Sequence, residues 1–189
     1  MPICGCGISG VDFKDGLAFP RFDEVDFHHG LFYEQDGLPP GSFDLITMWH
    51  FLEHCYDPPQ SLSHARSLLS PEGRLVIEVP RLDSRTARWF GPKWPGVQAP
   101  QHTVLFDRSH LERMVDQAGL EVVDYLPYGA FPPYFYIFAG TYFRLFGKGL
   151  NLDRIVAPYF LGQAILAPML WFERRLNLAM QTVVCRRKP

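Results

Sequence analysis

Two short apolar runs separated by a helical repeat dominate the middle of the chain. The first run, residues 43–48 (FDLITM), has the length of a strand buried on both faces. Small and apolar side chains then recur at helical spacing through residues 60–69, which predicts a helix with one buried face. The turn at residues 71–73 separates this helix from a second apolar run, residues 75–79, which Pro80 closes. Strand, helix and strand in this order predict a βαβ unit, which binds ligands at the carboxyl ends of its strands.

The same patterns predict further elements on either side of this unit. Apolar positions in residues 25–31 indicate another strand. A helix is expected from Ser109, which caps it with Glu112 three residues later, to Gly119. Two more strands are expected at residues 120–125 and 180–185, and all of these elements fit one domain spanning residues 1–189.

Composition narrows the class of protein. The chain has 189 residues, of which 47% are hydrophobic and 20% charged, with a formal net charge of −2. This balance indicates a folded domain and argues against a nucleic-acid partner. The four cysteines show no disulfide-framework spacing, and no signal peptide opens the sequence. We therefore expect a cytoplasmic protein.

A polar ridge follows the first apolar run directly. It contains His50, Glu53 and His54, and either imidazole can take a proton from an acceptor hydroxyl near pH 7. The alternative is that Glu53 and His54 only cap and orient the next helix, where the helix dipole favours a glutamate. The ridge also spells His-x-x-Glu-His, which supplies two ligands and a base in inverted zinc peptidases. Because it follows a buried strand and no third ligand is identifiable, no metal site is predicted.

A long segment without predicted secondary structure follows the second run. Residues 81–100 contain Trp89, Phe90 and Trp94, and long loops in compact domains are usually functional. These aromatic side chains are predicted either to form a lid over a ligand or to anchor a surface loop.

Three stretches of this sequence together carry a family resemblance. FDLITMWHFLEH, LLSPEGRLVIEVP and APQHTVLF resemble the second half of a class I S-adenosylmethionine-dependent methyltransferase, over residues 11–126. The resemblance implies an α/β fold: a Rossmann-like, doubly wound sheet, mostly parallel with an antiparallel last strand. It also implies S-adenosyl-L-methionine as the methyl donor, bound over the strand ends, and transfer of its methyl group to an acceptor.

The resemblance also implies roles for individual residues. Met48, Trp49 and His50 are placed beside the donor, next to its sulfonium sulfur. His102 matches a histidine that the family carries in a Pro-Arg-His element and is a candidate catalytic residue, with a satisfied core histidine as the alternative. Asp36, or less closely Glu34, matches an acidic residue that contacts the adenine amino group; a solvated loop carboxylate is the alternative.

The same resemblance bears on metal binding. Quinone O-methyltransferases bind a divalent cation through a similar Glu-x-x-Glu-His arrangement, in which His50 stands where the first glutamate would be. That substitution disfavours a site for magnesium or calcium, which prefer oxygen ligands.

The amino end allows two interpretations. Gly5, Gly7 and Gly10 form a Gly-x-Gly-x-x-Gly pattern that is typical of cofactor-binding turns, but the strand before it and the helix after it are not evident. In the second interpretation, residues 8–13 form the family's second strand and Asp12 accepts the ribose hydroxyls of the donor. The domain would then be amino-terminally truncated, without the first strand, and its sheet would have unpaired edges.

Between the last two predicted strands lies an apolar insertion, residues 130–178. Residues 155–172 are uncharged and just long enough to approach a membrane span, although two prolines and a glutamine make spanning unfavourable. Three interpretations of this helical insertion stay open: a membrane-surface hairpin through residues 131–172, a cap over a hydrophobic acceptor pocket, and a homodimer interface. The first places the protein peripherally on the inner face of the membrane.

The predicted function is methyl transfer from S-adenosylmethionine to an unidentified small-molecule acceptor that is hydrophobic or lipid-linked. The alternative is a catalytically inactive remnant of the fold that acts as a binding or membrane-docking module.

Overall fold

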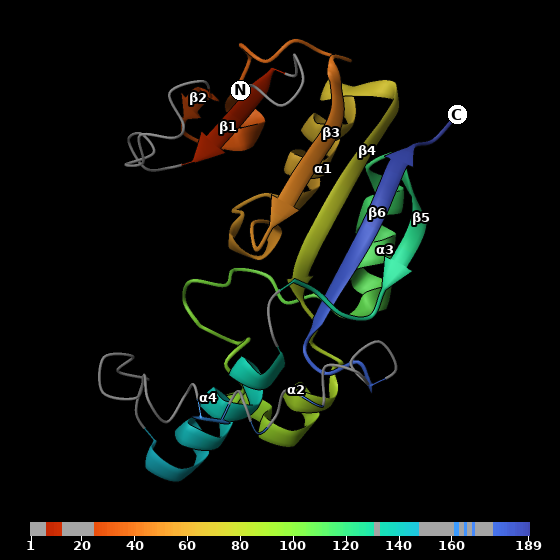
Figure 1. Ribbon diagram of the computed structural model, residues 1–189. Helices are drawn as coiled ribbons and strands as arrows, with labels where there is room; N and C mark the ends of the chain where they lie inside the picture. Colours follow the sequence, from red (N-terminus) through yellow and green to blue (C-terminus); the bar gives the residue numbers. More distant parts are fainter. Residues whose placement is uncertain are drawn as a thin grey trace.

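Two sheets and four α-helices form the part of the molecule that the computed structural model describes, residues 7–12, 25–130, 133–147, 161–162, 165, 168 and 176–189. The first sheet pairs β1 (Ile8–Asp12) and β2 (Val25–His29) in parallel. The second has the order β3-β4-β6-β5, made of β3 (Phe43–Trp49), β4 (Leu69–Pro80), β5 (Leu120–Leu126) and β6 (Met180–Arg187). The helices are α1 (Pro58–Leu68), α2 (Arg85–Phe90), α3 (Arg108–Gln117) and α4 (Pro133–Phe146), and Figure 1 shows their arrangement.

The predicted βαβ unit is confirmed as β3, α1 and β4. The two strands are parallel, with Met48 opposite Ile77. Proline occupies the first turn of α1, and the Asp57 side chain caps the helix by accepting a hydrogen bond from the Gln60 backbone N–H at 2.9 Å. Leu62 and the other apolar residues on one face of α1 are buried in the main core. The unit therefore fixes where β3 and β4 end.

The remaining strands also match the sequence prediction, and β6 is the antiparallel last strand. It pairs antiparallel with β4 on one side and with β5 on the other. Helices α1 and α3 lie behind this sheet in Figure 1 and contact each other. Leu111 and Val115 of α3 are fully buried in the same core cluster as Leu62, so one core lies under the whole four-stranded sheet.

Strand β3 departs from the prediction because it is not buried on both faces. Leu45 is 58% exposed and Trp49 is 50% exposed. The reason is that β3 pairs with β4 on one edge, and no strand among the described residues pairs with its other edge. A groove of about 810 Å³ lies there instead, between β1 and β3, with Val11 and Met48 among its lining residues. The expected truncation of the sheet stays a prediction. Among the described residues, the groove lies beside the edge of β3 where the family's first strand would be expected.

Several local expectations were wrong. The turn predicted at residues 71–73 lies inside β4, where the register shifts at a bulge. Helix α3 starts earlier than predicted, because Asp107 and not Ser109 caps it: Asp107 accepts from the His110 backbone N–H at 2.7 Å, and the Ser109 hydroxyl donates to Asp107 at 2.8 Å.

Residues 81–100 are not a structureless loop. They contain α2, whose first turn Ser84 caps through the Ala87 backbone N–H at 3.3 Å, and the short 3-10 helix η4 (Gly91–Lys93). Trp94 is only 2% exposed, and its indole Nε1 donates to the Thr86 hydroxyl at 2.9 Å. Trp94 is therefore part of a second, smaller core and not a surface lid, whereas Trp89 is 51% exposed.

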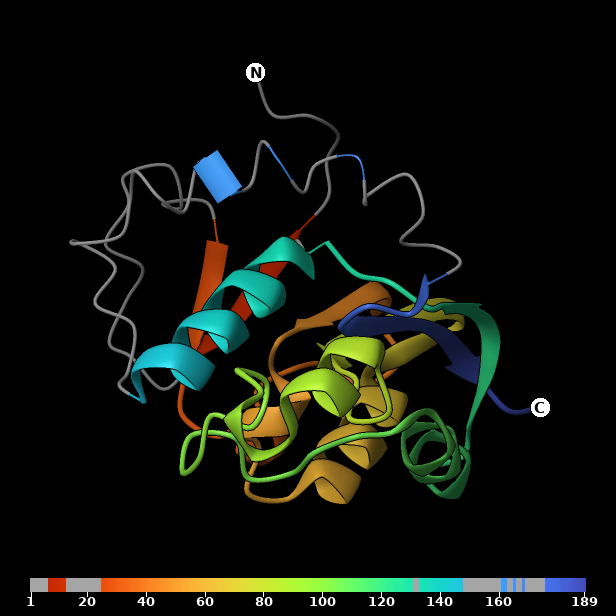
Figure 2. The ribbon, with the colours of Figure 1, turned by 90° about the horizontal axis from the view of Figure 1, so that it is seen from below.

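The described part of the apolar insertion is mainly α4. This helix lies with α2 beyond the carboxyl ends of β3 and β4 (Figure 1), and Figure 2 shows both helices from that side. The Tyr136 ring stacks on Trp94 with a centroid distance of 5.5 Å, and Gly140 sits against the Phe90 ring. Most of residues 155–172 lie outside the described residues, and with them the interpretations that rest on that segment. Among the helices that are described, none has both the length and the apolarity to cross a bilayer.

Candidate active site

The polar ridge begins with a histidine in an unusual backbone conformation. His50 directly follows β3 and has φ +49°, a region that residues other than glycine seldom occupy and that is often found at functional sites. Its backbone N–H donates to the Glu78 carbonyl oxygen at 3.1 Å, which ties the end of β3 to β4. The imidazole thereby lies between two carboxylates: Nδ1 is 3.4 Å from Glu53 Oε1, and Nε2 is 3.2 Å from Glu78 Oε1.

Glu78 is a site residue that the sequence analysis missed. It is 1% exposed near the end of β4, and its Oε2 accepts hydrogen bonds from the Ala130 backbone N–H at 2.7 Å and from the Thr182 hydroxyl at 3.3 Å. Gly129 makes this possible, because a Cβ there would lie 2.7 Å from the carboxylate carbon. A signal was present in the sequence: a single charged residue interrupts the apolar run LVIEVP close to its carboxyl end.

The two carboxylates keep His50 charged. The close contacts with Glu53 and, after it, Glu78 raise the pKa of the imidazole to about 9, although partial burial acts in the opposite direction. At pH 7 His50 is therefore an imidazolium that is ion-paired with both carboxylates. This disfavours the predicted role of His50 as a proton acceptor.

Glu53 and His54 lie in a separate short 3-10 helix, η3 (Leu52–His54), and not at the start of α1. The expectation that they cap α1 is therefore wrong, because Asp57 does so. The His-x-x-Glu-His segment is also not one continuous α-helix, so its two histidines do not share a helical face as in the zinc peptidase interpretation.

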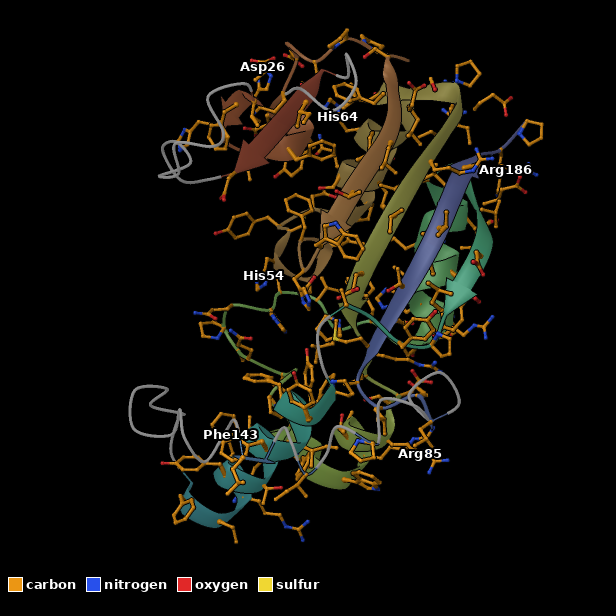
Figure 3. All side chains as sticks on the ribbon, viewed as in Figure 1. Asp26, His54, His64, Arg85, Phe143 and Arg186 are labelled. Atoms are coloured by element: carbon orange, nitrogen blue, oxygen red, sulfur yellow. The ribbon has the colours of Figure 1, made fainter. Side chains whose placement is uncertain are left out.

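His102 reaches the ridge from another segment of the chain. The Thr103 backbone N–H and hydroxyl donate to the Glu53 carbonyl oxygen at 2.8 and 3.1 Å, which holds residues 101–103 against η3. The rings of His54 and His102 meet edge to face with centroids 4.7 Å apart. Figure 3 shows His54 beyond the end of β3. Burial lowers the pKa of His102, and this effect outweighs the hydrogen bond to the Gly96 carbonyl oxygen, which raises the pKa. The imidazole is therefore neutral at pH 7.

The predicted donor-binding residues lie partly along the same edge. Met48 is buried at the end of β3 and lines the groove, and Trp49 is half exposed beside it. Asp12 is the last residue of β1, whose carboxyl end points to the same side as that of β3 in Figure 1. Its carbonyl oxygen accepts from the Gly30 backbone N–H at 3.0 Å. Asp36 is exposed in the turn after the short 3-10 helix η2 (Phe32–Glu34), where both interpretations of its role stay open.

Neither of the two described glycines of the pattern, Gly7 and Gly10, lies in a turn between a strand and a helix. Gly10 is in the middle of β1, where its Cα faces Val25 and Phe27 of β2, and Gly7 immediately precedes the strand. Gly5 lies outside the described residues. The interpretation of residues 8–13 as a strand is confirmed for residues 8–12, while the role of Asp12 stays a prediction.

Taken together, these features define a Rossmann-like α/β domain in which polar groups gather at the carboxyl ends of neighbouring strands, where such folds bind ligands. The chain belongs to the methyltransferase domain family, whose model matches residues 3–125.

Individual relatives agree with this assignment. A Mycolicibacterium smegmatis protein named "Probable S-adenosylmethionine-dependent methyltransferase" is 29% identical over 122 residues, covering 63% of this chain and 45% of that protein. The ubiquinone biosynthesis O-methyltransferase of Aromatoleum aromaticum is 28% identical over 139 residues, covering 67% of this chain and 59% of that protein. The chain thus spans about half the length of these curated relatives.

A solved structure confirms the fold. The S-adenosylmethionine-dependent methyltransferase of Mesorhizobium loti superposes with a TM-score of 0.56 at 13% sequence identity, covering 96% of this chain and 80% of that one.

Proposed function

We propose that the chain binds S-adenosylmethionine at the groove between β1 and β3 and transfers its methyl group to a small hydrophobic acceptor. One observation supports this proposal above all. Three features lie together at the carboxyl ends of the strands: the end of β1 with Asp12, the end of β3 with Trp49, and the polar ridge. The groove volume of about 810 Å³ is within the range typical of small-ligand pockets, and much of its lining is apolar.

The charges along this edge suit a positively charged donor. When bound, the donor supplies an electrophilic methyl group on a sulfonium sulfur. Glu53 and Glu78 carry two negative charges and His50 one positive charge, so the end of β3 has an excess of negative charge when all three groups are ionised. Asp12, the last residue of the adjacent strand β1, is the residue that we assign to the ribose hydroxyls of the donor.

The chain's part in the reaction is to align the acceptor and to handle its proton. Alignment contributes much of the rate in such displacements. Because His50 is already protonated, a hydroxyl acceptor would lose its proton to the group formed by Glu53, His54 and His102, which borders the ridge. This supports the assignment of His54 and His102, rather than His50, as catalytic residues.

Buried aromatic side chains lie behind this group and hold the segment that carries His102 in place. The His102 ring hydrogen-bonds to the Gly96 carbonyl oxygen, and Gly96 packs on the Trp94 ring, which stacks on Tyr136 of α4. The relative from Aromatoleum is named for ubiquinone biosynthesis, which is consistent with a hydrophobic small-molecule acceptor. A lipid-linked acceptor, contact with a membrane surface and a homodimer are narrower proposals that depend on residues 131–172.

Calorimetric titration with S-adenosylmethionine tests the donor site. We expect micromolar binding, and Asp12→Ala should weaken it about 10-fold or more, since a hydrogen bond to a charged group contributes about 1.5–3 kcal/mol. The matched control is Asp26→Ala, which removes an exposed carboxylate on the neighbouring strand β2 that is paired with His28.

Equal affinity of the Asp12→Ala variant, with its fold intact, would refute the placement of the ribose site. Absence of binding at millimolar donor would instead support a non-catalytic binding module.

A further inference from the structure

Three potential metal ligands converge where η3 meets the loop that carries His102. Within the described part of the chain, Glu53, His54 and His102 each offer one ligand atom, and these atoms all lie within 4.8 Å of one another. We propose that these three side chains form a site for a divalent transition-metal ion such as Zn²⁺. Binding of this ion does not depend on the proposed methyl transfer.

Both histidines are oriented as metal ligands usually are. Nδ1 of His54 is 3.0 Å from the Gln101 carbonyl oxygen, and Nδ1 of His102 is 2.7 Å from the Gly96 carbonyl oxygen. A carbonyl oxygen can only accept, so Nδ1 carries the proton in each neutral ring. The Nε2 lone pairs are then left for a ligand, and this outer hydrogen bond is the one that fixes the tautomer of metal-binding histidines.

Glu53 provides an independent observation that points to a ligand. Its side chain is 1% exposed, and neither carboxylate oxygen accepts a well-formed hydrogen bond from the described residues. The nearest cation is His50, with Nδ1 3.4 Å from one oxygen. Buried carboxylates normally accept several hydrogen bonds or coordinate a metal. A metal ion between Glu53 and the two imidazoles would satisfy this carboxylate.

The donor set determines the class of ion. Two imidazole nitrogens and one carboxylate oxygen suit Zn²⁺, Co²⁺ or Fe²⁺, whereas Mg²⁺ and Ca²⁺ prefer oxygen ligands alone. Three protein ligands leave a fourth position open, as in catalytic zinc sites. This set also differs from the Glu-x-x-Glu-His arrangement of quinone O-methyltransferases, because position 50 is engaged by Glu78 and His102 takes its place.

The three ligand atoms must move closer to one another before they can coordinate one ion. With ligand atoms about 2 Å from a tetrahedral ion, neighbouring ligand atoms are about 3.3 Å apart. The backbone is already held together, because Thr103 donates to the carbonyl oxygens of Glu53 and Cys55. Rotation of the partly exposed imidazoles of His54 and His102 is therefore the movement that binding needs.

An extension of this inference rests on the proposed function. An acceptor hydroxyl in the open position would have its pKa lowered by the ion, as metal-bound water does. The two imidazoles would then act as ligands rather than as proton acceptors.

Titration of chelator-treated protein with Zn²⁺, in the absence of donor and acceptor, tests the site. We expect one ion per chain with micromolar affinity or better, visible absorption bands when Co²⁺ is used instead, and no binding of Mg²⁺. Glu53→Gln and His102→Ala should each weaken Zn²⁺ binding by about 100-fold or more, because even the loss of an outer-shell partner costs 10–100-fold. The control His28→Ala removes an imidazole on β2 and should leave the affinity unchanged.

Wild-type affinity in folded Glu53→Gln and His102→Ala variants would overturn the proposal, and so would a loss of binding in His28→Ala. A measurement on the unaltered protein covers the case in which a variant does not fold. In histidine ¹⁵N NMR spectra, Zn²⁺ should shift the Nε2 resonances of His54 and His102. If neither resonance moves at saturating Zn²⁺, the site does not exist. Because no step uses the methyl donor, failure of this test leaves the proposed function untouched.

Discussion

Replacing Glu78 with glutamine tests whether the buried ridge holds the strand ends together. The glutamate joins three parts of the chain: His50 after β3, Ala130 before α4, and Thr182 in β6. Glutamine has the same shape and keeps an oxygen that can accept from Ala130. That oxygen also accepts from Thr182, so the amide NH₂ would replace Oε1 and face the charged His50, which is paired with Oε1 in the wild type.

The expected cost of Glu78→Gln is about 2–3 kcal/mol in the free energy of unfolding. Loss of one hydrogen bond between charged groups accounts for about 1.5–3 kcal/mol, and His50 keeps Glu53 as a partner, which limits the total. Urea unfolding followed by far-UV circular dichroism measures this cost, with the slope of the transition expected to be unchanged.

The matched control is Glu121→Gln, which removes the charge of a surface glutamate paired with Arg186. Such exposed pairs contribute about 0–1 kcal/mol. If Glu78→Gln costs no more than Glu121→Gln, the buried ridge does not hold the strand ends together.

Three further predictions concern packing and pH. Leu62→Ala should cost about 2–5 kcal/mol in urea unfolding, because Leu62 is completely buried on α1; a cost below about 1 kcal/mol would contradict the packing of that helix. Gly140→Ala should be destabilising, since its Cβ would lie 2.5 Å from the Phe90 ring, and the cost should shrink when Phe90 is also replaced with Ala. The Arg81 hydrogen bond holds the pKa of Asp83 below 3.8, so this pair stabilises the protein at neutral pH and loses that contribution as the pH falls through the lowered pKa. Urea midpoints measured from pH 7 down to pH 3 should therefore fall less steeply for Asp83→Asn than for the wild type.

Sequence periodicity was sufficient to predict the central unit of the fold. Strand β3, helix α1 and strand β4 follow from local patterns, because their buried faces are continuous and proline marks the first turn of α1. The exposure of Leu45 was not predictable, since it depends on what lies beside β3 and not on the residues of β3 itself. Helix α2 was missed because six residues are too short to show a period, although Ser84 at its cap is a recognisable signal.

The sequence indicated individual residues of the candidate site but not their arrangement, and the roles assigned to those residues stay predictions. His50, His54 and His102 were all selected from the sequence, and the structure brings the last two into ring contact. The charge of His50 could not be predicted, because it depends on how the structure places Glu53 of η3 and Glu78 of the neighbouring strand against the imidazole. The position of His102 depends on hydrogen bonds from Thr103 to η3, and sequence spacing does not encode contacts between distant segments.

Among the described residues, no strand pairs with the facing edges of β1 and β3, and this has a consequence for the behaviour of concentrated protein in solution. Ile8 and Leu45 are each more than half exposed, and they flank backbone that a passing extended chain can pair with. Concentrated samples are therefore expected to self-associate through this groove. An added short apolar peptide in extended conformation should compete with that association, raise the melting temperature and keep the protein monodisperse during light-scattering measurements.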